Sequence, residues 1–531
     1  MRIQKFDYAA IPQCSTVDVA YVNGNPALRP FFKYDTDLQS FSEVINDKSK
    51  AEINREVLVE VLLDQYARYT PSEKVLANIE SLRKDNTFTV VTAHQPCLFT
   101  GPLYYIFKIV AAINLAGQLK SAYPEYNFVP VFISGGEDHD FEEINHCHLF
   151  GKTLTWQTDE KGPVGKMSTA SLEPVLAELK NILGEQEEAK ALYARIANIH
   201  QAHPDYGTAA CHLAHDFFKD HGLVVLNTFD ARLKGLFIDE MKEEILNQVS
   251  HPIINSTIEK IIEAGFHPQA TPREINFFYL GDGLRERIVW EDDRFWVLNT
   301  GINFSRLEME AEIENHPDRF SPNVVMRPLF QEKILPNLAY IGGGGELAYW
   351  LERKAQFEHF GINYPMLVRR SSAMWVDRGT AKKMKKLGFT TDDLWADTDA
   401  LIRKYLAENA SVEIELTEEK KAVEALFSSL AEKTKSLDPS LVKTVLAEQA
   451  KILNSLGSLE SRLVRAGKQK HETAVNQIRS IKEKLFPGNG LQERYDNFIP
   501  FYLKYQERFF EVLFDNLHPL EKKFVVVIDD E

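Results

Sequence analysis

The sequence predicts an α/β protein whose parallel sheet is followed by a C-terminal α-helical domain. An apolar, β-rich run at residues 88–91 precedes a helical pattern over about 102–119 and a second apolar run at 128–133. Strand, helix and strand in this order form a βαβ unit, in which the two strands are parallel. The same order of strand, glycine-rich loop and helix returns at 338–346, and leucines with heptad spacing dominate the chain beyond residue 377.

Polar residues follow both strands of the first βαβ unit. They are His94, Gln95, Thr100 and Gly101 after the first strand, and Glu137, Asp138, His139 and Asp140 after the second. Ligands of open parallel sheets bind beyond the carboxyl ends of the strands. We therefore expect the active site at this edge of the sheet.

The two loops at this edge have different predicted roles. Thr100 is a candidate N-cap, Gly101 lets a ligand approach the backbone, and Pro102 suits the first helical turn. Such a helix start favours phosphate or carboxylate, although the same residues also serve as a simple helix cap. Four consecutive ionisable residues, 137–140, are costly to place after a buried strand unless they face a solvated cleft. This cluster suits an amine or a metal, and the alternative is that one of its aspartates only caps the next helix.

The composition is that of an ordinary globular protein, with 44% hydrophobic and 26% charged residues in a chain of 531. This length allows two or three domains. A net charge of −16 argues against a nucleic-acid partner. Four cysteines without a CxxC pair indicate a reducing compartment, and neither a signal peptide nor an apolar run of membrane-spanning length is evident. We therefore expect a cytoplasmic protein with no membrane segment.

We divide the chain into a core domain at residues 1–376 and a helical domain at 377–531. The core begins with helical patterns between about 40 and 84, and connecting segments interrupt it at about 150–220 and 265–320. The first segment is a polar loop followed by helices. The second holds short strands with turn residues between them, which predicts a small antiparallel insertion.

The second half of the sheet supplies further candidate residues. A helix carrying Arg327 and Gln331 precedes the next strand and the glycine run 342–345, and the last strand runs into Arg369 and Arg370. Two arginines at the carboxyl end of a strand suit phosphate or carboxylate, because a guanidinium holds either group bidentately. A solvated surface pair is the alternative.

Residues beyond about 377 have the pattern of long helices. The apolar residues in heptad spacing are Leu430, Leu437, Leu441 and Val445, then Ile452, Leu456, Leu459 and Leu463, and finally Ile478, Ile481 and Leu485. Such spacing predicts a coiled coil or an antiparallel helical hairpin. Pro439 begins one long helix, the turn at 487–490 ends it, and an aromatic-rich helix at about 491–516 folds back on the core. We expect this arm to dimerise the enzyme or to brace the cleft.

Four segments carry a resemblance to a known family. They read LFTGPLYYIFKI at 98–109, PVFISGGEDHDFEEINH at 130–146, HPDRFSPNVVMRPLFQE at 316–332 and GGGELAYWLERKAQF at 343–357. Together with the helical arm, they resemble the BshC family, the cysteine-adding enzymes of bacillithiol biosynthesis. The resemblance implies a class I synthetase-like Rossmann core with connecting insertions, and a C-terminal coiled coil that forms a homodimer. It also implies a ligase that joins L-cysteine to glucosaminyl malate in the last step of bacillithiol biosynthesis.

The chain departs from the pattern of this family at two loops. It has His94-Gln95-Pro96-Cys97 where the family reads Gln-Gln-Ala-Gly, and Gly343-Gly344-Gly345-Glu346 where the family reads Gly-Pro-Gly-Glu. The first change supplies a histidine at the predicted site. The HIGH motif of class I synthetases is missing, and an echo of their KMSKS loop at 165–169 follows an early strand rather than the last one.

An ionised carboxylate is a poor electrophile, so amide formation calls for ATP, which turns the cysteine carboxylate into an acyl-adenylate or an acyl-phosphate. The identity of the nucleotide stays open, Mg²⁺ is a candidate companion, and no residue is assigned to a resident metal. We assign the chemistry to Glu137, Asp138, His139 and Asp140; the nucleotide to His94, Gln95, Thr100, Gly101, Gly343, Gly345, Glu346, Arg369 and Arg370; and the substrates to Asn145, Arg327, Gln331 and Tyr349.

Two other interpretations of the chain stay open. In one, residues 137–140 form the metal site of an amide hydrolase, which predicts bound zinc or manganese. In the other, the chain is a non-catalytic coiled-coil scaffold with a vestigial nucleotide fold, which predicts no response to ATP, cysteine or an amino-sugar malate. The concentration of ionisable residues at the strand edges favours an enzyme.

Overall fold

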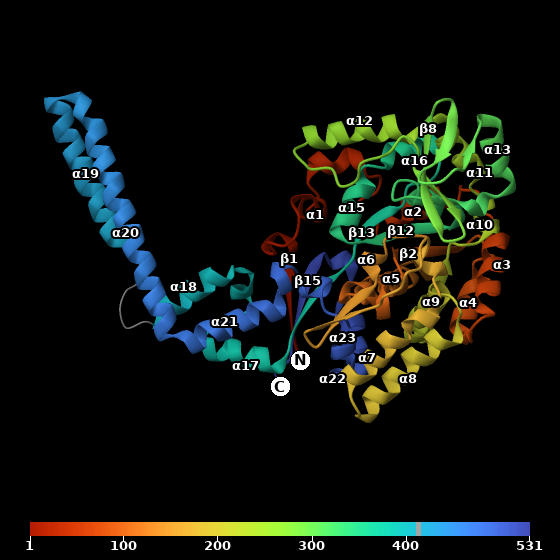
Figure 1. The fold of residues 1–531 in the computed structure, drawn as a ribbon, viewed down its shortest axis with the longest axis horizontal. Helices are drawn as coiled ribbons and strands as arrows, with labels where there is room; N and C mark the ends of the chain where they lie inside the picture. Colours follow the sequence, from red (N-terminus) through yellow and green to blue (C-terminus); the bar gives the residue numbers. More distant parts are fainter. Residues whose placement is uncertain (410–415, 531) are drawn as a thin grey trace. The chain divides into compact units, whose positions relative to one another are not determined.

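The chain forms two compact units. The computed structural model describes residues 1–409 and 416–530 (Figure 1). The first unit, here called the core unit, comprises Lys5–Met374 and Glu493–Val526. The second, the helical unit, comprises Met1–Gln4, Trp375–Gln492 and the C-terminal residues from Val527. No helix within the described ranges is long and apolar enough to span a bilayer.

A five-stranded parallel sheet forms the centre of the core unit. Its strands lie in the order β13 (Met366–Arg369), β12 (Asn337–Gly342), β2 (Thr87–His94), β3 (Asn127–Ser134) and β6 (Val224–Asn227). Numbered along the chain this is 5-4-1-2-3, the strand order of a Rossmann-type sheet. The predicted α/β class with a parallel sheet is confirmed. The order reverses between β2 and β12, and such switch points are where these sheets bind ligands.

The register of the strands brings their carboxyl ends together. His94 pairs with Ser134, and Ser134 pairs with Asn227. On the other side of the switch point, Gly342 pairs with Arg369. Because the strands are parallel, the loops that follow them leave the same edge. This edge therefore receives Gln95, Gly135, Thr228, Gly343 and Arg370.

Helices cover both faces of this sheet, and several of them are labelled in Figure 1. Alternate residues of a strand face opposite sides, so Phe88 and Val90 join one hydrophobic cluster while Val91 and Ala93 join the other. The first cluster includes α2 (Phe41–Lys48) and α5 (Leu103–Ala122). The second includes α3 (Arg55–Tyr66), α4 (Glu73–Ser81), α11 (Ile238–Asn247), α14 (Arg327–Ile334) and α15 (Gly344–Leu351). Burial on both faces explains why the strands read as continuous apolar runs.

Two insertions interrupt the alternation of strands and helices. The first comprises the hairpin of β4 (His146–Leu149) and β5 (Lys152–Thr155), then α7 (Glu173–Leu183), α8 (Glu187–Ala202) and α9 (Tyr206–Phe218). The second is an antiparallel sheet of β7 (Phe277–Gly281), β8 (Leu284–Glu291), β9 (Arg294–Val297), β10 (Asn303–Phe304) and β11 (Phe320–Pro322). The antiparallel insertion predicted from turn residues is confirmed.

Residues Glu493–Val526 belong to the core unit although they follow the helical unit in the chain. They include α22 (Ile499–Tyr505) and α23 (Glu507–Asn516). The ring of Phe217 on α9 lies 5.0 Å from that of Phe498 and 6.1 Å from those of Tyr502 and Phe510. The prediction that this aromatic-rich segment folds back on the core is confirmed.

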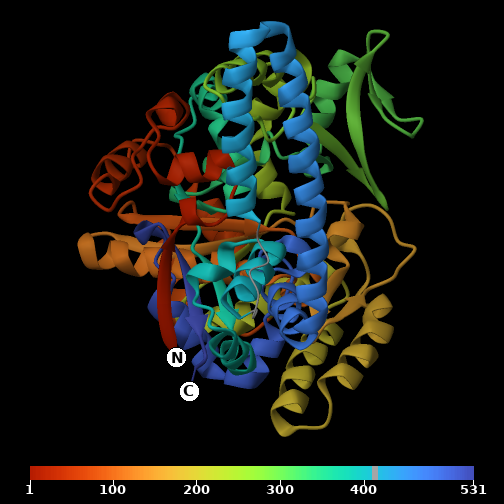
Figure 2. The same cartoon turned by 90° about the vertical axis from the view of Figure 1, so that its left-hand side faces the viewer.

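The helical unit contains α17 (Arg378–Leu387), α18 (Thr398–Asn409), α19 (Thr417–Leu437), α20 (Val442–Lys470) and α21 (Glu472–Leu485). Helices α19 and α20 form an antiparallel hairpin, which Figures 1 and 2 show. In the turn between them, the side chain of Asp438 accepts a hydrogen bond from the Ser440 amide. The single helix predicted from Pro439 onward is wrong, because His471 leaves the helical conformation (φ −109°, ψ 29°) and separates α20 from α21.

The start of α5 also differs from the prediction. The helix begins at Leu103 with Pro102 in the N-cap position, so the predicted N-cap at Thr100 is wrong. Thr100 has a left-handed backbone (φ 72°) within a short turn. Gly101 has a φ of 60°, and an added Cβ would lie 2.6 Å from the Cβ of Cys97. The tight turn itself therefore requires glycine here.

A second close approach fixes the glycine loop before α15. Gly344 has no room for a side chain, because an added Cβ would lie 2.2 Å from Oδ2 of Asp18. Asp18 is buried and accepts a hydrogen bond from Nε of Arg369 at 2.9 Å. An added Cβ on the next residue, Gly345, would meet nothing within 4 Å. Adjacent glycines of one loop thus meet very different constraints.

We expect Gly344→Ala to lower the free energy of unfolding by about 2–4 kcal/mol, because its Cβ displaces Asp18 and leaves the charge of Arg369 buried without a partner. Gly345→Ala is the matched control. It should leave stability unchanged or raise it by up to about 1 kcal/mol, since alanine favours a helix over glycine. Denaturant unfolding measures both, and equal stability of the two variants would contradict the close contact with Asp18.

Candidate functional site

A cavity of about 610 Å³ opens at the carboxyl edge of the parallel sheet. Loops after all five strands contribute to its wall, together with α14, α15 and the inserted antiparallel sheet. Its polar lining residues include His94, Gln95, Tyr104, Glu137, Asp138, Glu143, Thr228, Arg285, Arg327, Gln331, Glu346, Tyr349, Arg370 and Arg494. The cavity lies at the switch point between β2 and β12, where the strand order predicts it.

One end of the cavity is acidic. The side-chain amide of Gln95 donates to Oδ2 of Asp138 at 2.8 Å and to Oε2 of Glu143 at 3.0 Å, so it holds two carboxylates side by side. Asp138 also accepts from the His139 amide at 2.8 Å and lies 3.3 Å from the guanidinium of Arg285. Burial alone would raise the pKa of Asp138, but these hydrogen bonds and the charge of Arg285 outweigh it and hold the pKa well below its usual value. Asp138 is therefore ionised at neutral pH.

Glu137, the neighbour of Asp138, is paired with a lysine beneath the cavity wall. Its Oε2 accepts from Nζ of Lys234 at 2.8 Å, and its Oε1 accepts from Thr228 at 3.3 Å. Lys234 is buried in α10 (Ala231–Gly235) and also donates to the carbonyl of Phe320 at 3.0 Å. The pair ties the loop after β3 to the inserted sheet, and the charge of Glu137 is already balanced.

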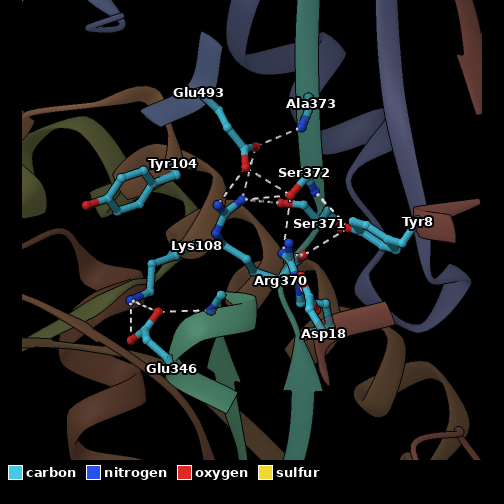
Figure 3. A network of polar contacts seen from close by, with 12 residues as sticks. Tyr8, Asp18, Tyr104, Lys108, Glu346, Arg370, Ser371, Ser372, Ala373 and Glu493 are labelled. Carbon is cyan, nitrogen blue, oxygen red and sulfur yellow. Dashed lines mark hydrogen bonds and ion pairs between the residues drawn. The ribbon is translucent and has the colours of Figure 1, made fainter. Parts of the chain in front are cut away.

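The other end of the cavity is built around the glycine loop before α15. Oε2 of Glu346 accepts from the Gly343 amide at 2.9 Å, and Lys108 of α5 donates to both oxygens of Glu346 at 2.8 Å (Figure 3). The Tyr340 hydroxyl donates to Oε1 at 2.7 Å. Burial would raise the pKa of Glu346, but the charge of Lys108 and these hydrogen bonds lower it to about 2. Both oxygens of the Glu346 carboxylate are therefore engaged in hydrogen bonds that hold the glycine loop in place.

Arg369, the last residue of β13, and Arg370, which follows it, are each bound to a buried carboxylate. Arg369 donates to Asp18 at 2.9 Å, and Arg370 donates to Glu493 at 2.7 and 3.1 Å (Figure 3). All four residues are at most 4% exposed. A buried guanidinium without a partner would be strongly destabilising, so each pair fixes its arginine in place. Arg370 lines the cavity and Arg369 does not.

His94 and Tyr104 form a hydrogen-bonded pair on the cavity wall. Nδ1 of His94 lies 3.0 Å from the carbonyl oxygen of Gln95, and Nε2 lies 2.9 Å from the Tyr104 hydroxyl. A carbonyl only accepts, so Nδ1 carries the hydrogen and Nε2 accepts from the hydroxyl. Burial and the charge of Lys108 lower the pKa of His94 to about 4. The imidazole is therefore neutral at physiological pH.

Arg327 of α14 lines the cavity with neutral hydrogen-bond partners. Its guanidinium donates to the Tyr349 hydroxyl at 2.6 Å and to Oε1 of Gln331 at 3.3 Å. Gln331 in turn donates to the buried Glu332 at 2.8 Å, which fixes the orientation of the amide. Arg327 thus presents a positive charge to the cavity from a well-held position.

A smaller hollow of about 380 Å³, here called the annex, adjoins the acidic end. It shares Asp138, Glu143 and Arg285 with the cavity and adds His139, Asp140, Arg273 and Arg287. The guanidinium of Arg285 lies 3.9 Å from the centroid of the Phe278 ring, and its Nη1 lies 2.6 Å from Nδ1 of His139. Because arginine only donates, Nδ1 of His139 is the acceptor in this contact.

Nearly the whole chain matches two domains described for one protein family. The N-terminal Rossmann-like domain described for bacillithiol biosynthesis BshC matches residues 1–371, and the C-terminal coiled-coil domain of the same description matches residues 373–528. The chain belongs to the BshC family. Its Rossmann-like core and its coiled-coil domain, both expected from the sequence, are confirmed by these matches.

Curated BshC relatives are similar over nearly their whole length. A Flavobacterium johnsoniae protein named "Putative cysteine ligase BshC" is 40% identical over 509 residues, which is 96% of each chain. Proteins of the same name from Flavobacterium psychrophilum and Christiangramia forsetii are both 39% identical; they cover 97% and 96% of this chain and 97% and 95% of their own. A solved structure titled "putative arginyl t-RNA synthetase" from Campylobacter jejuni covers 88% of this chain and 98% of its own at a TM-score of 0.22 and 11% identity. So low a score carries no argument, and the class I synthetase-like character of the core stays a prediction.

Most residues assigned from the sequence line the main cavity of this BshC chain. They are His94, Gln95, Glu137, Asp138, Arg327, Gln331, Gly343, Gly345, Glu346, Tyr349 and Arg370. His139 and Asp140 line the annex instead. Asn145 lines neither hollow, and its Oδ1 lies 3.1 Å from Nδ1 of His146.

The loop of Thr100 and Gly101 does not reach the cavity either. The side chain of Asn497 donates to the carbonyls of Phe99 and Gly101 at 2.9 and 2.6 Å. The amide of Leu103, at the start of α5, donates to the carbonyl of Asp496 at 2.8 Å. The chain itself thus occupies the helix start that the sequence suggests for phosphate.

Several lining residues of the BshC cavity escape prediction from the sequence, among them Tyr104, Glu143, Thr228, Arg285 and Arg494. Tyr104 and Glu143 lie inside the motifs LFTGPLYY and GEDHDFEE, so a signal for them exists. Arg285 belongs to the inserted antiparallel sheet, and Arg494 belongs to the segment that follows the helical unit in the sequence. Neither has a local motif that places it at the cavity.

The described parts of the chain, residues 1–409 and 416–530, contain no group of three or more His, Cys, Asp or Glu side chains arranged to hold a metal ion. Within residues 137–140, Glu137 is paired with Lys234, and Asp138 is held by Gln95. These contacts turn the two carboxylates toward different neighbours. The metal site of the alternative hydrolase interpretation therefore finds no support in these side chains.

We expect His94 to stay neutral between about pH 5.5 and 8, because its pKa is lowered to about 4 while a histidine in water titrates near 6.5. In protein labelled with ¹⁵N-histidine, the His94 signals are those lost in His94→Gln. They should keep the shifts of an Nδ1-protonated neutral ring across this range, whereas exposed histidines shift. A midpoint near 6.5 for His94 would contradict the half-buried, hydrogen-bonded pair with Tyr104.

Proposed function

We propose that the protein joins the carboxyl group of L-cysteine to the amino group of glucosaminyl malate, the last step of bacillithiol biosynthesis. The observation that carries the proposal is the polarity of the cavity, with ionised Asp138 beside Glu143 at one end and a glycine loop with Arg370 at the other. An enzyme that activates the carboxylate of an amino acid needs one site for the ammonium group and another for the phosphates of the nucleotide. The acidic end suits the ammonium, and the other end suits the phosphates of the activating nucleotide. The name of the curated relatives, cysteine ligase, supports this chemistry.

The glycine loop fits a phosphate group of ATP. An added Cβ on Gly345 would meet nothing within 4 Å, so the backbone there is open to a ligand, and one on Gly343 would lie 3.5 Å from Nε of Arg370. Helix α15 begins at Gly344, and the free amides of its first turn favour an anion. We place the phosphates of ATP at this loop, against Arg370, with Mg²⁺ entering as the companion of the nucleotide.

The acidic end fits the ammonium group of cysteine. Asp138 and Glu143 are held side by side by Gln95; among the described residues Asp138 has an ion-pair partner, Arg285, and Glu143 has none. An ammonium placed between the two carboxylates would form charge-assisted hydrogen bonds with both. Its carboxyl group would then point along the cavity toward the glycine loop.

The annex fits glucosaminyl malate. Malate carries two carboxylates, and Arg273 and Arg287 line the annex. The annex shares a wall with the acidic end of the cavity, so an acceptor bound there would bring its amine beside the activated cysteine. Arg327, whose partners in the cavity are neutral, is the alternative ligand for one malate carboxylate.

The proposed reaction has two steps. A carboxylate oxygen of cysteine attacks phosphorus of ATP, giving either an acyl-adenylate with release of pyrophosphate or an acyl-phosphate with release of ADP. The amine of glucosaminyl malate then attacks the acyl carbon, and AMP or phosphate leaves with the electrons of the broken C–O bond. The amine gives up a proton, for which Asp140 is the better acceptor because Nδ1 of His139 is already bound by Arg285. The chain contributes position and fixed charge to both steps.

The test is to incubate the purified protein with L-cysteine, glucosaminyl malate and ATP and to identify the products by mass. We expect the cysteinyl amide together with an equal amount of either AMP or ADP. AMP selects the acyl-adenylate and ADP the acyl-phosphate. Cleavage of an added amide without consumption of ATP would support a hydrolase instead.

In the same assay, Asp138→Asn should raise the KM for cysteine between about ten- and hundredfold, because the ammonium loses a charged partner. The KM for ATP should stay close to that of the wild type. Asp159→Asn, an exposed carboxylate of the first insertion, is the matched control and should change neither constant. An unchanged KM for cysteine in Asp138→Asn would remove this residue from the binding of the amino acid.

We also propose that the hairpin of α19 and α20 dimerises the protein. Neither helix contains a buried residue, and several apolar side chains of the hairpin are exposed. They are Leu426, Leu430, Leu437, Leu441, Leu446, Ile452 and Leu459, between 39% and 87% exposed. Contiguous apolar surface of this kind marks an association site, and a second hairpin offers a complementary stripe.

Replacing Leu426 and Leu437 together by Lys should convert a dimer into a monomer, because charges on the apolar stripe would have to be desolvated in the interface. Sedimentation velocity across a range of protein concentrations measures the change. Lys443→Ala, an exposed position on the same hairpin, is the control and should leave the dimer intact. A wild-type protein that sediments as a monomer at all concentrations would contradict the proposal.

A further inference from the structure

The buried cations around the cavity are each neutralised by a carboxylate of their own. The pairs are Lys108 with Glu346, Lys234 with Glu137, Arg369 with Asp18, and Arg370 with Glu493, at distances of 2.7 to 2.9 Å. Arg285 is similarly placed 3.3 Å from Asp138. These pairs shape the cavity but leave little net positive charge for an anionic ligand.

Two of the cations that line the cavity are not neutralised in this way. Among the described residues, neither Arg327 nor Arg494 forms an ion pair with a carboxylate. Arg327 is nevertheless engaged, since it donates to Tyr349 and Gln331. Arg494 is exposed and has no hydrogen-bond partner within the described ranges; its recorded contact is with the ring of Tyr104.

The backbone around Arg494 is held firmly although its side chain is free. The preceding residue, Glu493, is fully buried against Arg370 and accepts from the Ala373 amide at 3.0 Å (Figure 3). The following residue, Tyr495, stacks on His148 with ring centroids 3.7 Å apart. A free guanidinium on a fixed backbone is ready for a ligand and loses little backbone entropy on binding.

Arg494 lies at the glycine-loop end of the cavity. Its guanidinium carbon is 6.0 Å from the centroid of the Tyr104 ring, and that of Arg370 is 5.3 Å from the same centroid. Arg370 in turn lies beside Gly343, where its Nε would be 3.5 Å from an added Cβ. Tyr104, Arg370 and the buried Glu493 appear together in Figure 3.

We infer that Arg494 is a phosphate-binding residue of this cavity and that the segment following the helical unit supplies it. The inference rests on the proposed use of a nucleotide. A triphosphate carries several negative charges, whereas the charge of Arg370 is already offset by Glu493. Arg494 adds an unbalanced guanidinium at the same end, in the form that binds phosphate oxygens bidentately.

Binding of inorganic tripolyphosphate and of ATP, measured by calorimetry on the full chain, tests the inference. We expect Arg494→Ala to weaken both by about tenfold or more, Arg494→Lys to recover part of the loss, and the salt dependence of binding to become shallower. Arg508→Ala, on α23 of the same unit, is the control and should bind as the wild type does. The thermal midpoint of Arg494→Ala should not change, because the side chain has no recorded ion pair. Binding within twofold of the wild type would overturn the inference.

Steady-state kinetics separate this inference from the proposed function. If the wild type makes the amide and Arg494→Ala raises the KM for ATP but not for cysteine, both stand. If the wild type makes the amide and Arg494→Ala leaves the KM for ATP unchanged, or raises only that for glucosaminyl malate, the inference fails and the function stands. If the wild type makes no amide but binds tripolyphosphate through Arg494, the proposed function fails and the phosphate site stands.

Discussion

A charge buried beneath the cavity requires a partner, and this requirement determines how the core unit is held together. Removing one member of a buried ion pair typically costs roughly 3–5 kcal/mol, since the other is left without compensation. In this protein the pairs join elements that are remote in sequence: Asp18 of α1 (Thr16–Val22) holds Arg369 at the end of β13, and Lys108 of α5 holds Glu346 of α15. The polar network is therefore part of the framework that positions the loops of the site.

The same requirement divides the charged residues of the cavity into two groups. Those with a buried partner, such as Glu137 and Arg370, fix the wall. Arg327 and Arg494 have no carboxylate partner among the residues that the structure describes, and these are the two cations that we propose bind a ligand. Fixed dipoles and charges that are already oriented before a substrate binds need no reorganisation when charge develops on it. The neutral His94–Tyr104 pair extends this arrangement, because it adds a defined hydrogen-bond pattern without adding charge.

Much of the core could be predicted because its signals are local. The apolar runs, the glycine loops and the polar residues at the strand ends each occupy a few consecutive positions, and the parallel register converts them into one site. The sequence could not show which side chains form hydrogen bonds and ion pairs with one another. Thr100 and Gly101 form an attractive helix start for phosphate in isolation, yet Asn497, almost 400 residues away, donates to the carbonyls of Phe99 and Gly101 and holds this turn against the chain itself. Arg369 and Arg370 look alike in the sequence, yet they bind different buried carboxylates, and only Arg370 lines the cavity.

The partnership of Arg370 with Glu493 has a consequence for how the molecule is made. The two residues are 123 positions apart, and the whole hairpin lies between them. During synthesis, β13 emerges long before the carboxylate that neutralises the arginine beside it. A nascent chain that ends within the hairpin would bury the guanidinium of Arg370 without a carboxylate partner, and this disfavours the compact state. The cavity can therefore form only after nearly the entire polypeptide has been synthesised. We expect fragments that lack the segment after the hairpin to fold poorly and to bind no substrate.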